Sequence, residues 1–191
     1  MAKLSIIGPG NMGQAISGIA GAGGHEVQLL GHGDTGTPAD GDIVVLAVPY
    51  PNVAEVLEQR ATELEGKIVV DITNPLNFET FDELTVPADS SAAAEIAAQL
   101  PNARVLKAFN TTLAATLSAG KVGSLTTTVL IAGDDADAKS TLAGVITSGG
   151  LNAIDVGGLK RARELEALGF LQITMAAGEK VSWTGGFGIV S

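Results

Sequence analysis

A glycine-rich stretch near the N-terminus constrains the fold of this chain more than any other feature of its sequence. The mostly apolar segment 3–7 is followed by Gly8, Gly10 and Gly13, which have the spacing G-x-G-x-x-G. Apolar residues then recur at helical spacing, at Met12, Ala15, Ile16 and Ile19. The pattern predicts a strand, a tight turn and a helix, which together open a dinucleotide-binding fold.

Each glycine of this motif has its own predicted role. Gly8 permits the tight turn, Gly10 lets the backbone approach a pyrophosphate, and Gly13 lets the helix pack closely against the sheet. The phosphates are expected at the helix N-terminus, where free N–H groups favour an anion. The alternative is a turn that merely connects a strand to a helix. It explains less well why all three glycines have the motif's spacing and are flanked by the expected apolar residues. The predicted cofactor contacts here are Gly8, Pro9, Gly10, Asn11, Met12 and Gly13.

The composition of the chain disfavours several classes of function. Its 191 residues suit one domain, and a hydrophobic fraction of 46% allows a sizeable core. A net charge of -10 argues against nucleic acid or an anionic membrane surface as a partner. Cysteine is absent, which excludes disulfides and thiolate catalysis and fits a reducing compartment. No signal peptide or membrane-spanning run is recognisable, so a cytoplasmic location is expected.

Strand-like and helical patterns alternate along the rest of the chain, which predicts an α/β fold with a doubly wound parallel sheet. Further strands are expected at 26–30, 42–48, 67–72, 104–108, 126–132 and 152–156. Helices are expected at 52–64, at 92–100 after the capping residues Ser90 and Ser91, from Asp134 or Asp135 to near Gly149, and from near Gly158. The whole chain, 1–191, is predicted to be one NAD(P)-binding Rossmann-like domain, on which the helix and tail of 158–191 pack.

The last helix and the tail carry less specific signals. Six residues of the helix are expected to face the core: Leu159, Ala162, Leu165, Leu168, Leu171 and Met175. Charged residues at three- and four-residue spacing favour surface ion pairs over a substrate-facing cluster: Lys160, Arg163, Glu164 and Glu166. The apolar face near Phe170 is consistent with either a homodimer surface or a buried helix. Residues 183–188 are either a mobile flap over a bound acceptor or a docked terminal segment.

The ends of the first five predicted strands point to a ligand groove. In a doubly wound sheet, ligands bind beyond the carboxyl ends of the strands. Here those ends carry glycine, proline, asparagine and threonine, in the segments 8–10, 31–33, 48–51, 73–76 and 109–112. Each turn alone could simply end a strand, but a rigid polar rim made of five such turns suits a nicotinamide and its ribose.

The turn after the second strand bears on which dinucleotide is preferred. Enzymes that use NAD usually have an acidic residue there, about 20 residues past the glycines, which binds the adenosine 2′-hydroxyl. This chain has Gly31, His32 and Gly33 instead, so backbone N–H groups and His32 can receive a 2′-phosphate, which favours NADP(H). The absence of an arginine from the turn weakens that inference. Two alternatives stay open, namely a solvated His32 and an Asp34 that turns inward and selects NAD.

Several motifs in order and at matching spacing carry a family resemblance: residues 7–13, 47–50, 70–76, 107–111 and 159–166. The chain resembles the coenzyme F420-dependent NADP oxidoreductase family, in particular its short bacterial members. In that family the glycine motif holds the pyrophosphate, the second-strand turn holds the 2′-phosphate, and three further turns surround the nicotinamide. The resemblance implies further cofactor contacts at Gly31, His32, Gly33, Ala47, Val48, Pro49, Tyr50, Thr73, Asn74, Pro75, Ala108, Phe109, Asn110 and Thr111. Family members often have Ser or Thr followed by Arg where this chain has Gly31 and His32.

The resemblance implies an NADP(H)-dependent oxidoreductase that transfers hydride between the nicotinamide and a flat small-molecule acceptor. Candidate acceptors are deazaflavin F420, a flavin, or ferric iron reduced through a flavin, because the family is also similar to the cytosolic domain of membrane ferric reductases. Hydride transfer needs control of distance and face more than an acid or base, so no catalytic residue is assigned. His25 and His32 belong to no serine–carboxylate constellation, and no metal site is expected.

Two other functions are compatible with the sequence. Residues 7–13 also resemble the start of pyrroline-carboxylate reductases, which suggests an imine or hydroxyacid reductase. Such enzymes need a long helical second domain, and only a short segment follows Gly158 in this chain. A non-enzymatic protein that binds NADP(H) and senses redox state has the same fold requirements.

Overall fold

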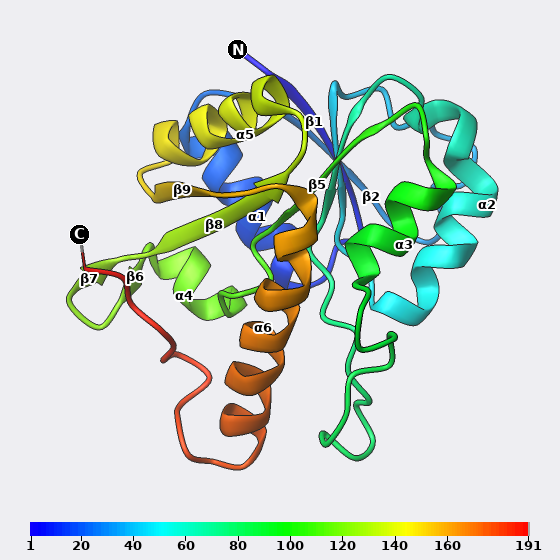
Figure 1. The fold of residues 1–191 in the computed structure, drawn as a ribbon. Helices are drawn as coiled ribbons and strands as arrows, with labels where there is room; N and C mark the ends of the chain where they lie inside the picture. The colour runs from blue at the N-terminus through cyan, green and yellow to red at the C-terminus, as the bar shows by residue number, and fades with distance from the viewer. Residues whose placement is uncertain (191) are drawn as a thin grey trace.

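The computed structural model describes residues 1–190, and its centre is a seven-stranded sheet with helices on both faces (Figure 1). The strands lie in the order β2 (Glu26–Leu30), β1 (Lys3–Ile7), β3 (Ile43–Leu46), β4 (Ile68–Asp71), β5 (Arg104–Ala108), β8 (Thr128–Gly133) and β9 (Asn152–Gly157). A separate antiparallel pair is formed by β6 (Lys121–Val122) and β7 (Leu125–Thr126). The helices are α1 (Asn11–Ala22), α2 (Val53–Leu64), α3 (Ala92–Gln99), α4 (Ala114–Ala119), α5 (Ala136–Ser148) and α6 (Ala162–Ala177), with 3-10 turns η1 (Tyr50–Asn52) and η2 (Leu159–Arg161).

The strand order creates a crevice beside β1. Strand β1 pairs in parallel with β2 on one side and with β3 on the other, so the chain reverses its direction of winding there. Loops that leave the carboxyl ends of β1 and β3 therefore diverge, and ligands bind in the opening between them in folds of this type. The expected fold class, an α/β doubly wound sheet, is confirmed.

Two hydrophobic cores lie on opposite faces of the sheet because successive side chains of each strand point to opposite faces. Leu4 and Ile6 of β1 join α1 and α5 in one core, whereas Ile7 joins α2 and α3 in the other. Figure 1 shows α1 and α5 to one side of the sheet and α2 and α3 to the other. Both faces of the central strands are covered, which explains why these strands are nearly continuous apolar runs.

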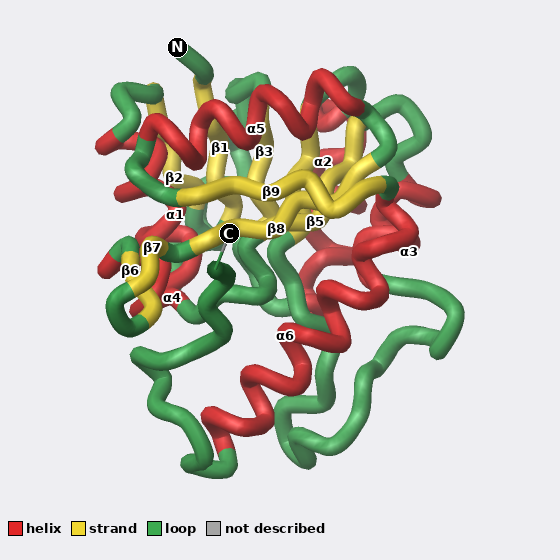
Figure 2. The backbone as a smooth tube through the Cα atoms, turned by 60° about the vertical axis from the view of Figure 1, so that its left-hand side comes forward, coloured by secondary structure: helices red, strands yellow, loops and turns green. Residues whose placement is uncertain are grey.

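The expectation of an entirely parallel sheet is wrong at one pair of strands. Strand β8 runs antiparallel to β5, with Leu106 opposite Gly133 and Ala108 opposite Ile131. Between them the chain forms only α4 and the β6–β7 pair, neither of which the sequence analysis predicted (Figure 2). A six-residue helix is about 9 Å long, whereas β5 extends about 16 Å, so α4 alone does not span the length of a strand as the helix of a parallel crossover does.

Helix α6 begins at the sheet and then extends past its rim, so that only its first half packs on the strands (Figure 1). Beyond Gly169 it packs instead on a third, small core with Leu76, Leu113, Ile173 and Ala176. Leu171 was expected to face the core, but its side chain is exposed because that side of the helix has left the sheet. None of the helices within residues 1–190 combines the length and apolar character that a membrane span requires.

Candidate functional site

The glycine turn has the geometry expected for a phosphate-binding loop. Gly8 has a φ of +117°, and a Cβ there would overlap the carbonyl group of Ala47. A Cβ on Gly13 would overlap the carbonyl oxygen of Gly8, so helix α1 lies against the turn. A Cβ on Gly10 would meet no heavy atom within 4 Å. The conformational roles of Gly8 and Gly13 are thus confirmed, while Gly10 borders open space in which a ligand can approach the backbone.

The N-terminus of α1 fits an anionic ligand. Among residues 1–190 no side chain caps this helix, and its first turn contains no acidic residue. Side-chain oxygens cap two other helices, Ser91 at α3 and Asp135 at α5, whereas within the same residues α2 and α6 also lack a side-chain cap but begin away from the glycine turn. Free N–H groups and the positive end of the helix dipole therefore face the glycine turn without a protein partner. This arrangement fits the pyrophosphate of a dinucleotide.

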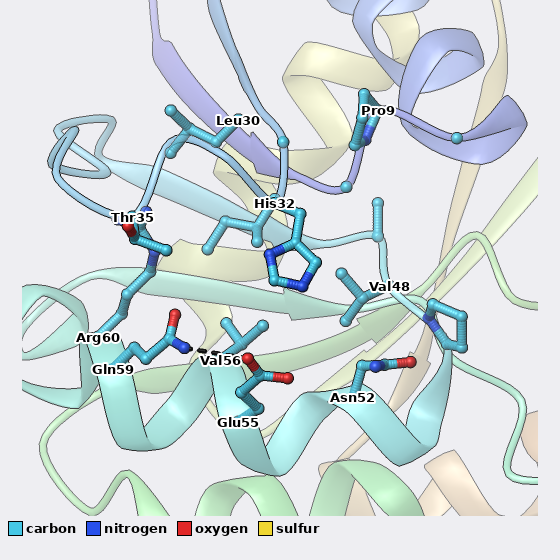
Figure 3. A pocket seen from close by; sticks show the side chains of 16 residues that line it. Pro9, Leu30, His32, Thr35, Val48, Asn52, Glu55, Val56, Gln59 and Arg60 are labelled. Carbon is cyan, nitrogen blue, oxygen red and sulfur yellow. Dashed lines mark hydrogen bonds between the residues drawn. The ribbon is translucent and has the colours of Figure 1, made fainter.

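A first cavity of about 310 Å³ opens at the ends of β1, β2 and β3 (Figure 3). The predicted cofactor residues that line it are Gly8, Pro9, Gly10, Gly31, His32, Ala47, Val48 and Pro49. Helix α2 forms the opposite wall, and Figure 3 shows His32 directed toward that side. The turns at 8–10, 31–32 and 47–49 thus line one cavity, which lies on the β2 side of the glycine turn.

Helix α2 also brings an arginine to this cavity, which sequence reasoning missed. Arg60 is almost completely buried, and its guanidinium donates to the carbonyl oxygens of Asp34 at 2.8 Å and Thr37 at 2.9 Å. It also contacts the carboxylate of Glu63 at 2.9 Å. A signal was present, because Arg60 interrupts the apolar face of α2 at a position between Leu57 and Leu64. Thr35, Asn52, Glu55, Val56 and Gln59 are further lining residues that were not predicted.

Asp34 turns toward the end of β2, which was one of the alternatives left open. Its Oδ2 accepts a hydrogen bond from the backbone N–H of Gly31 at 2.8 Å. One of the N–H groups expected to receive a 2′-phosphate is therefore already satisfied by a carboxylate. The guanidinium of Arg60 and the carboxylate of Asp34 therefore lie at the same end of the cavity.

A second cavity of about 430 Å³ lies at the ends of β1, β4 and β5, on the other side of the glycine turn. Four predicted cofactor residues line it: Asn11, Met12, Asn74 and Asn110. Its other walls come from segments that sequence reasoning did not assign to the cofactor, including Ile72, Leu113, Ile173 on α6 and two aromatic residues, Phe78 and Trp183. The lining is mainly apolar with several amide groups at the rim.

The remaining predicted residues line neither cavity: Gly13, Gly33, Tyr50, Thr73, Pro75, Ala108, Phe109 and Thr111. Tyr50 donates its hydroxyl hydrogen to Glu95. Burial raises the pKa of Tyr50 above its ordinary range, and the neighbouring carboxylate of Glu95 raises it further. Phe109 is buried with a φ of +63°, a conformation uncommon outside glycine, and it turns the chain at the end of β5. Tyr50 and Phe109 therefore help to hold the turns of the rim without lining either cavity.

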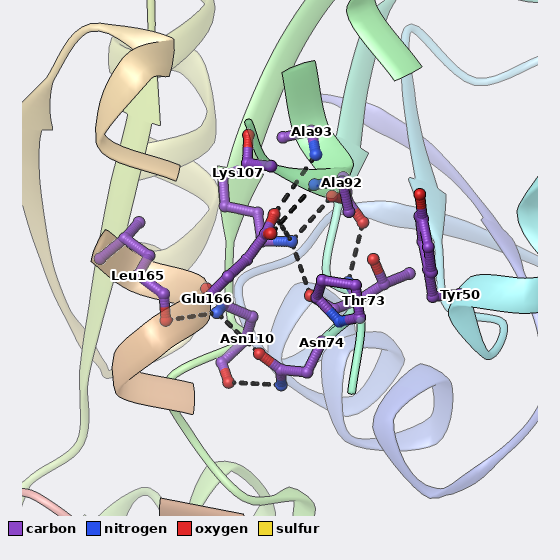
Figure 4. A network of polar contacts seen from close by, with 12 residues as sticks. Tyr50, Thr73, Asn74, Ala92, Ala93, Lys107, Asn110, Leu165 and Glu166 are labelled. Atoms are coloured by element: carbon purple, nitrogen blue, oxygen red, sulfur yellow. Dashed lines mark hydrogen bonds and ion pairs between the residues drawn. The ribbon is translucent and has the colours of Figure 1, made fainter. Parts of the chain in front are cut away.

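A buried ion network lies beneath the rim (Figure 4). The Nζ atom of Lys107 is 2.8 Å from both Asp71 and Glu166, and 2.6 Å from the carbonyl oxygen of Thr73. Glu166 also accepts hydrogen bonds from the backbone N–H groups of Ala92 at 2.9 Å and Ala93 at 3.3 Å. The network therefore ties together β4, β5, the start of α3 and α6.

The expected surface ion pairing is wrong for Glu166, which is buried against Lys107. Burial raises the pKa of Glu166, and the charge of Lys107 opposes that rise. Glu164 does pair at the surface, with Arg161 at 3.9 Å. Spacing along one helix could not distinguish the two glutamates, because the partner of Glu166 lies on a distant strand.

Helix α6 is seated directly on two turns of the rim. Asn74 donates to the carbonyl oxygen of Asn110 at 2.9 Å, and Asn110 donates to Asn74 at 3.0 Å and to the carbonyl oxygen of Leu165 at 2.8 Å. A Cβ on Gly169 would overlap the side-chain oxygen of Asn74, so only glycine permits this approach. Within residues 1–190, the buried atoms Thr73 Oγ1 and Asn110 Oδ1 lack a hydrogen-bond partner. Unpaired buried groups of this kind are uncommon, and that of Asn110, which lines the second cavity, fits a site for a polar ligand.

Comparison with known proteins agrees with this geometry. The family model described as NADP oxidoreductase, coenzyme F420-dependent, matches residues 33–75. An F420-dependent NADP reductase from Methanocaldococcus jannaschii is 31% identical over 166 residues, which cover 85% of this chain and 74% of that protein. The metalloreductase STEAP3 from Rattus norvegicus is 37% identical over 108 residues, which are 56% of this chain and 21% of that protein.

A solved structure is similar over its entire length. It is that of a protein from Arthrobacter sp. FB24 proposed to be an F420-dependent NADP reductase, with a TM-score of 0.84, 25% identity and full coverage of both chains. The sequence relative matches over most of both chains, and the solved structure shares the whole architecture, including the segment that carries α6. The chain therefore belongs to the family of coenzyme F420-dependent NADP oxidoreductases.

Proposed function

We propose that this chain, an NADP-dependent oxidoreductase by family, transfers hydride between the nicotinamide of NADP(H) and a flat acceptor in the second cavity. The acceptor is a deazaflavin, a flavin, or ferric iron reduced through a flavin. One observation carries the proposal: the glycine turn and the uncapped start of α1 lie between two cavities at the switch point of the sheet. A dinucleotide has its phosphates in the middle and a ring system at each end, which matches this order.

In this proposal the two halves of the dinucleotide occupy different cavities. The backbone at Gly10 and the N-terminus of α1 hold the pyrophosphate. The adenosine half lies in the first cavity against α2, where a ring nitrogen of His32 can donate a hydrogen bond to a 2′-phosphate and Arg60 holds the turn at Asp34 and Thr37 in place. The nicotinamide half lies toward Asn74 and Asn110, whose mutual hydrogen bonds keep their turns in place.

Hydride transfer requires little from the protein beyond positioning the two rings and excluding water from the cavity. When bound, the nicotinamide supplies or receives the hydride. Met12, Ile72, Leu113 and Ile173 give the second cavity an apolar lining, which excludes water and presses two flat rings into contact. The lining residues include no histidine, aspartate or glutamate that could act as a general acid or base. The reaction is therefore controlled by the distance and the face at which the two rings meet.

A single assay tests this function. Purified protein is mixed with NADPH or NADH and with FMN, FAD, a deazaflavin or a ferric chelate, and the loss of nicotinamide absorbance is followed. We expect NADPH oxidation with at least one flat acceptor, and none with a Gly10→Leu variant. Tight NADPH binding without turnover on any acceptor would favour the sensor, and turnover only on an imine or a 2-oxoacid would favour the other reductase class.

A further inference from the structure

Two exposed aromatic side chains border the second cavity from different segments of the chain. Phe78 lies in the loop between β4 and α3, and Trp183 lies in the tail after α6. Each is 52% exposed, although most large apolar side chains of this protein are buried. Exposed aromatic residues beside a ligand cavity differ from scattered surface residues, because a bound ring can cover them.

The loop that carries Phe78 is held in one conformation by local contacts. The ring of Phe78 packs edge-on against Phe81, with centroids 5.8 Å apart and an interplanar angle of 84°. Phe81 has a φ of +54°, and its N–H donates to the carbonyl oxygen of Asn77 at 2.8 Å. The side chain of Asn77 accepts from the backbone of Glu79 at 3.0 Å, which closes the start of the loop. Phe78 is therefore presented by an ordered loop rather than by a free chain.

The tail that carries Trp183 is attached at points on both sides of it. The N–H of Val181 donates to the carbonyl oxygen of Met175 on α6 at 3.4 Å. Further along, Phe187 donates its N–H to the side-chain oxygen of Gln172 at 3.2 Å, and Gln172 itself is buried. Between these attachments, Ser182 accepts hydrogen bonds from Thr184 at 3.1 Å and from Gly185 at 2.8 Å. This turn leaves the indole of Trp183 half-exposed at the cavity.

We propose that Phe78 and Trp183 stack on the flat ring of the hydride acceptor, on the side turned away from the nicotinamide, and thereby form the aromatic wall of its binding site. The inference rests on the proposed function, and it assigns the acceptor to a conjugated ring system with polar edges. The faces of such a ring match the aromatic and apolar lining, while its polar edges match the amides of Asn11, Asn74 and Asn110. The tail of residues 181–188 then selects for flat acceptors as part of the site.

Binding measurements test the proposal without relying on turnover. The protein is loaded with NADP⁺, and the dissociation constants of riboflavin and 5-deazariboflavin are measured by equilibrium dialysis. We expect Trp183→Leu and Phe78→Leu each to weaken binding roughly 3- to 10-fold, the loss of one aromatic stack. Both side chains are half-exposed, so the variants should fold, which circular dichroism can verify.

Two control variants change exposed apolar residues that do not line the cavity. Phe187→Leu alters the same tail, and Leu171→Ala alters α6, with wild-type exposures of 43% and 50%. Both controls should bind the two probes as the wild type does. Equal weakening in Phe187→Leu and Trp183→Leu would mean that the tail acts only as a scaffold, which overturns the stacking role of Trp183.

Fluorescence gives an independent measurement, because Trp183 is the only tryptophan of the chain. A flavin ring in contact with an indole loses its emission, so saturating wild-type protein should quench riboflavin more strongly than saturating Trp183→Leu. Unchanged affinity and quenching in that variant, or no binding of either probe to the wild type, would overturn the inference. Probe binding that depends on Trp183 but without turnover would instead contradict the proposed function, so the two failures can be distinguished.

Discussion

Lys107 on β5 and Glu166 on α6 form a buried ion pair, with 2.8 Å between Nζ and Oε1 and side chains 0% and 1% exposed. The same Lys107 nitrogen binds Asp71 and the carbonyl oxygen of Thr73, so it joins the terminal helix to a turn of the rim. Because α6 also contributes Ile173 to the second cavity, the position of this helix decides the shape of the proposed acceptor site.

Replacing Lys107 by methionine should strongly destabilise the fold. The change leaves Asp71 and Glu166 buried without their common cation, and breaking a buried pair in this way costs about 3–5 kcal/mol. Urea unfolding at pH 7 measures the effect. Lys139→Met is the control, since its partner Asp155 is largely exposed and the loss should stay below about 1 kcal/mol. A similarly small loss for both variants would contradict the structural role given to Lys107.

The stability contributed by Glu166 should fall as the pH rises. Burial raises its pKa in the folded chain above the ordinary value of 4.5, so the folded state holds a proton that the unfolded state has released. Unfolding then releases a proton in the interval from 4.5 up to the folded pKa, and raising the pH through it favours unfolding. Compared with Glu166→Gln, the wild type should lose relative stability as the pH is raised above 4.5 through this interval in urea titrations. A relative gain over this interval would show that the pKa is lowered instead.

Gly10 and Gly13 should respond differently to substitution. Gly10→Leu places its side chain in open space with a φ of -68°, so the fold should remain stable while NADPH binding is lost. Gly13→Ala forces a methyl group onto the carbonyl oxygen of Gly8, which should cost about 1–3 kcal/mol of stability. Thermal unfolding and NADPH titration measure the two properties separately. Normal NADPH affinity in Gly10→Leu would refute the pyrophosphate contact.

Asp34 should weaken the preference for NADPH over NADH. Its carboxylate lies at the end of β2 beside the proposed 2′-phosphate position, and Asn at this place keeps an oxygen that can accept the hydrogen bond from Gly31. We expect Asp34→Asn to raise the ratio of kcat/KM for NADPH over NADH about 5-fold, since one unfavourable charge interaction near the surface is worth about 1 kcal/mol. Asp40→Asn is the control, because Asp40 pairs with Lys3 outside the cavity. An unchanged ratio in Asp34→Asn would place the 2′-phosphate elsewhere.

Much of the fold could be predicted from the sequence because it depends on local chemistry. The turn at Gly8 requires a positive φ, and the close approach of α1 requires that Gly13 has no side chain. Both roles can therefore be predicted from the spacing of the glycines. The central strands are apolar runs because helices cover both faces, and this pattern is also visible in the sequence.

The features that were missed depend on contacts between distant segments. The antiparallel direction of β8 accompanies the short helix α4, whose sequence pattern did not indicate a helix. Arg60 reaches the first cavity only because α2 packs next to the turn of Asp34 and Thr37. Phe78 and Trp183 border one cavity because the loop after β4 and the tail after α6 both extend past the rim of the sheet.

The sequence by itself determined the dinucleotide-binding architecture, the conformation of the glycine turn and the set of strand ends that form the rim. Those features follow from backbone conformation and from the period of apolar residues, which are properties of short segments. Only the tertiary structure decided the partner of Glu166, the approach of Arg60 and the walls of the second cavity. Charge pairing and cavity shape depend on which segments meet in space, and no spacing along the chain specifies that.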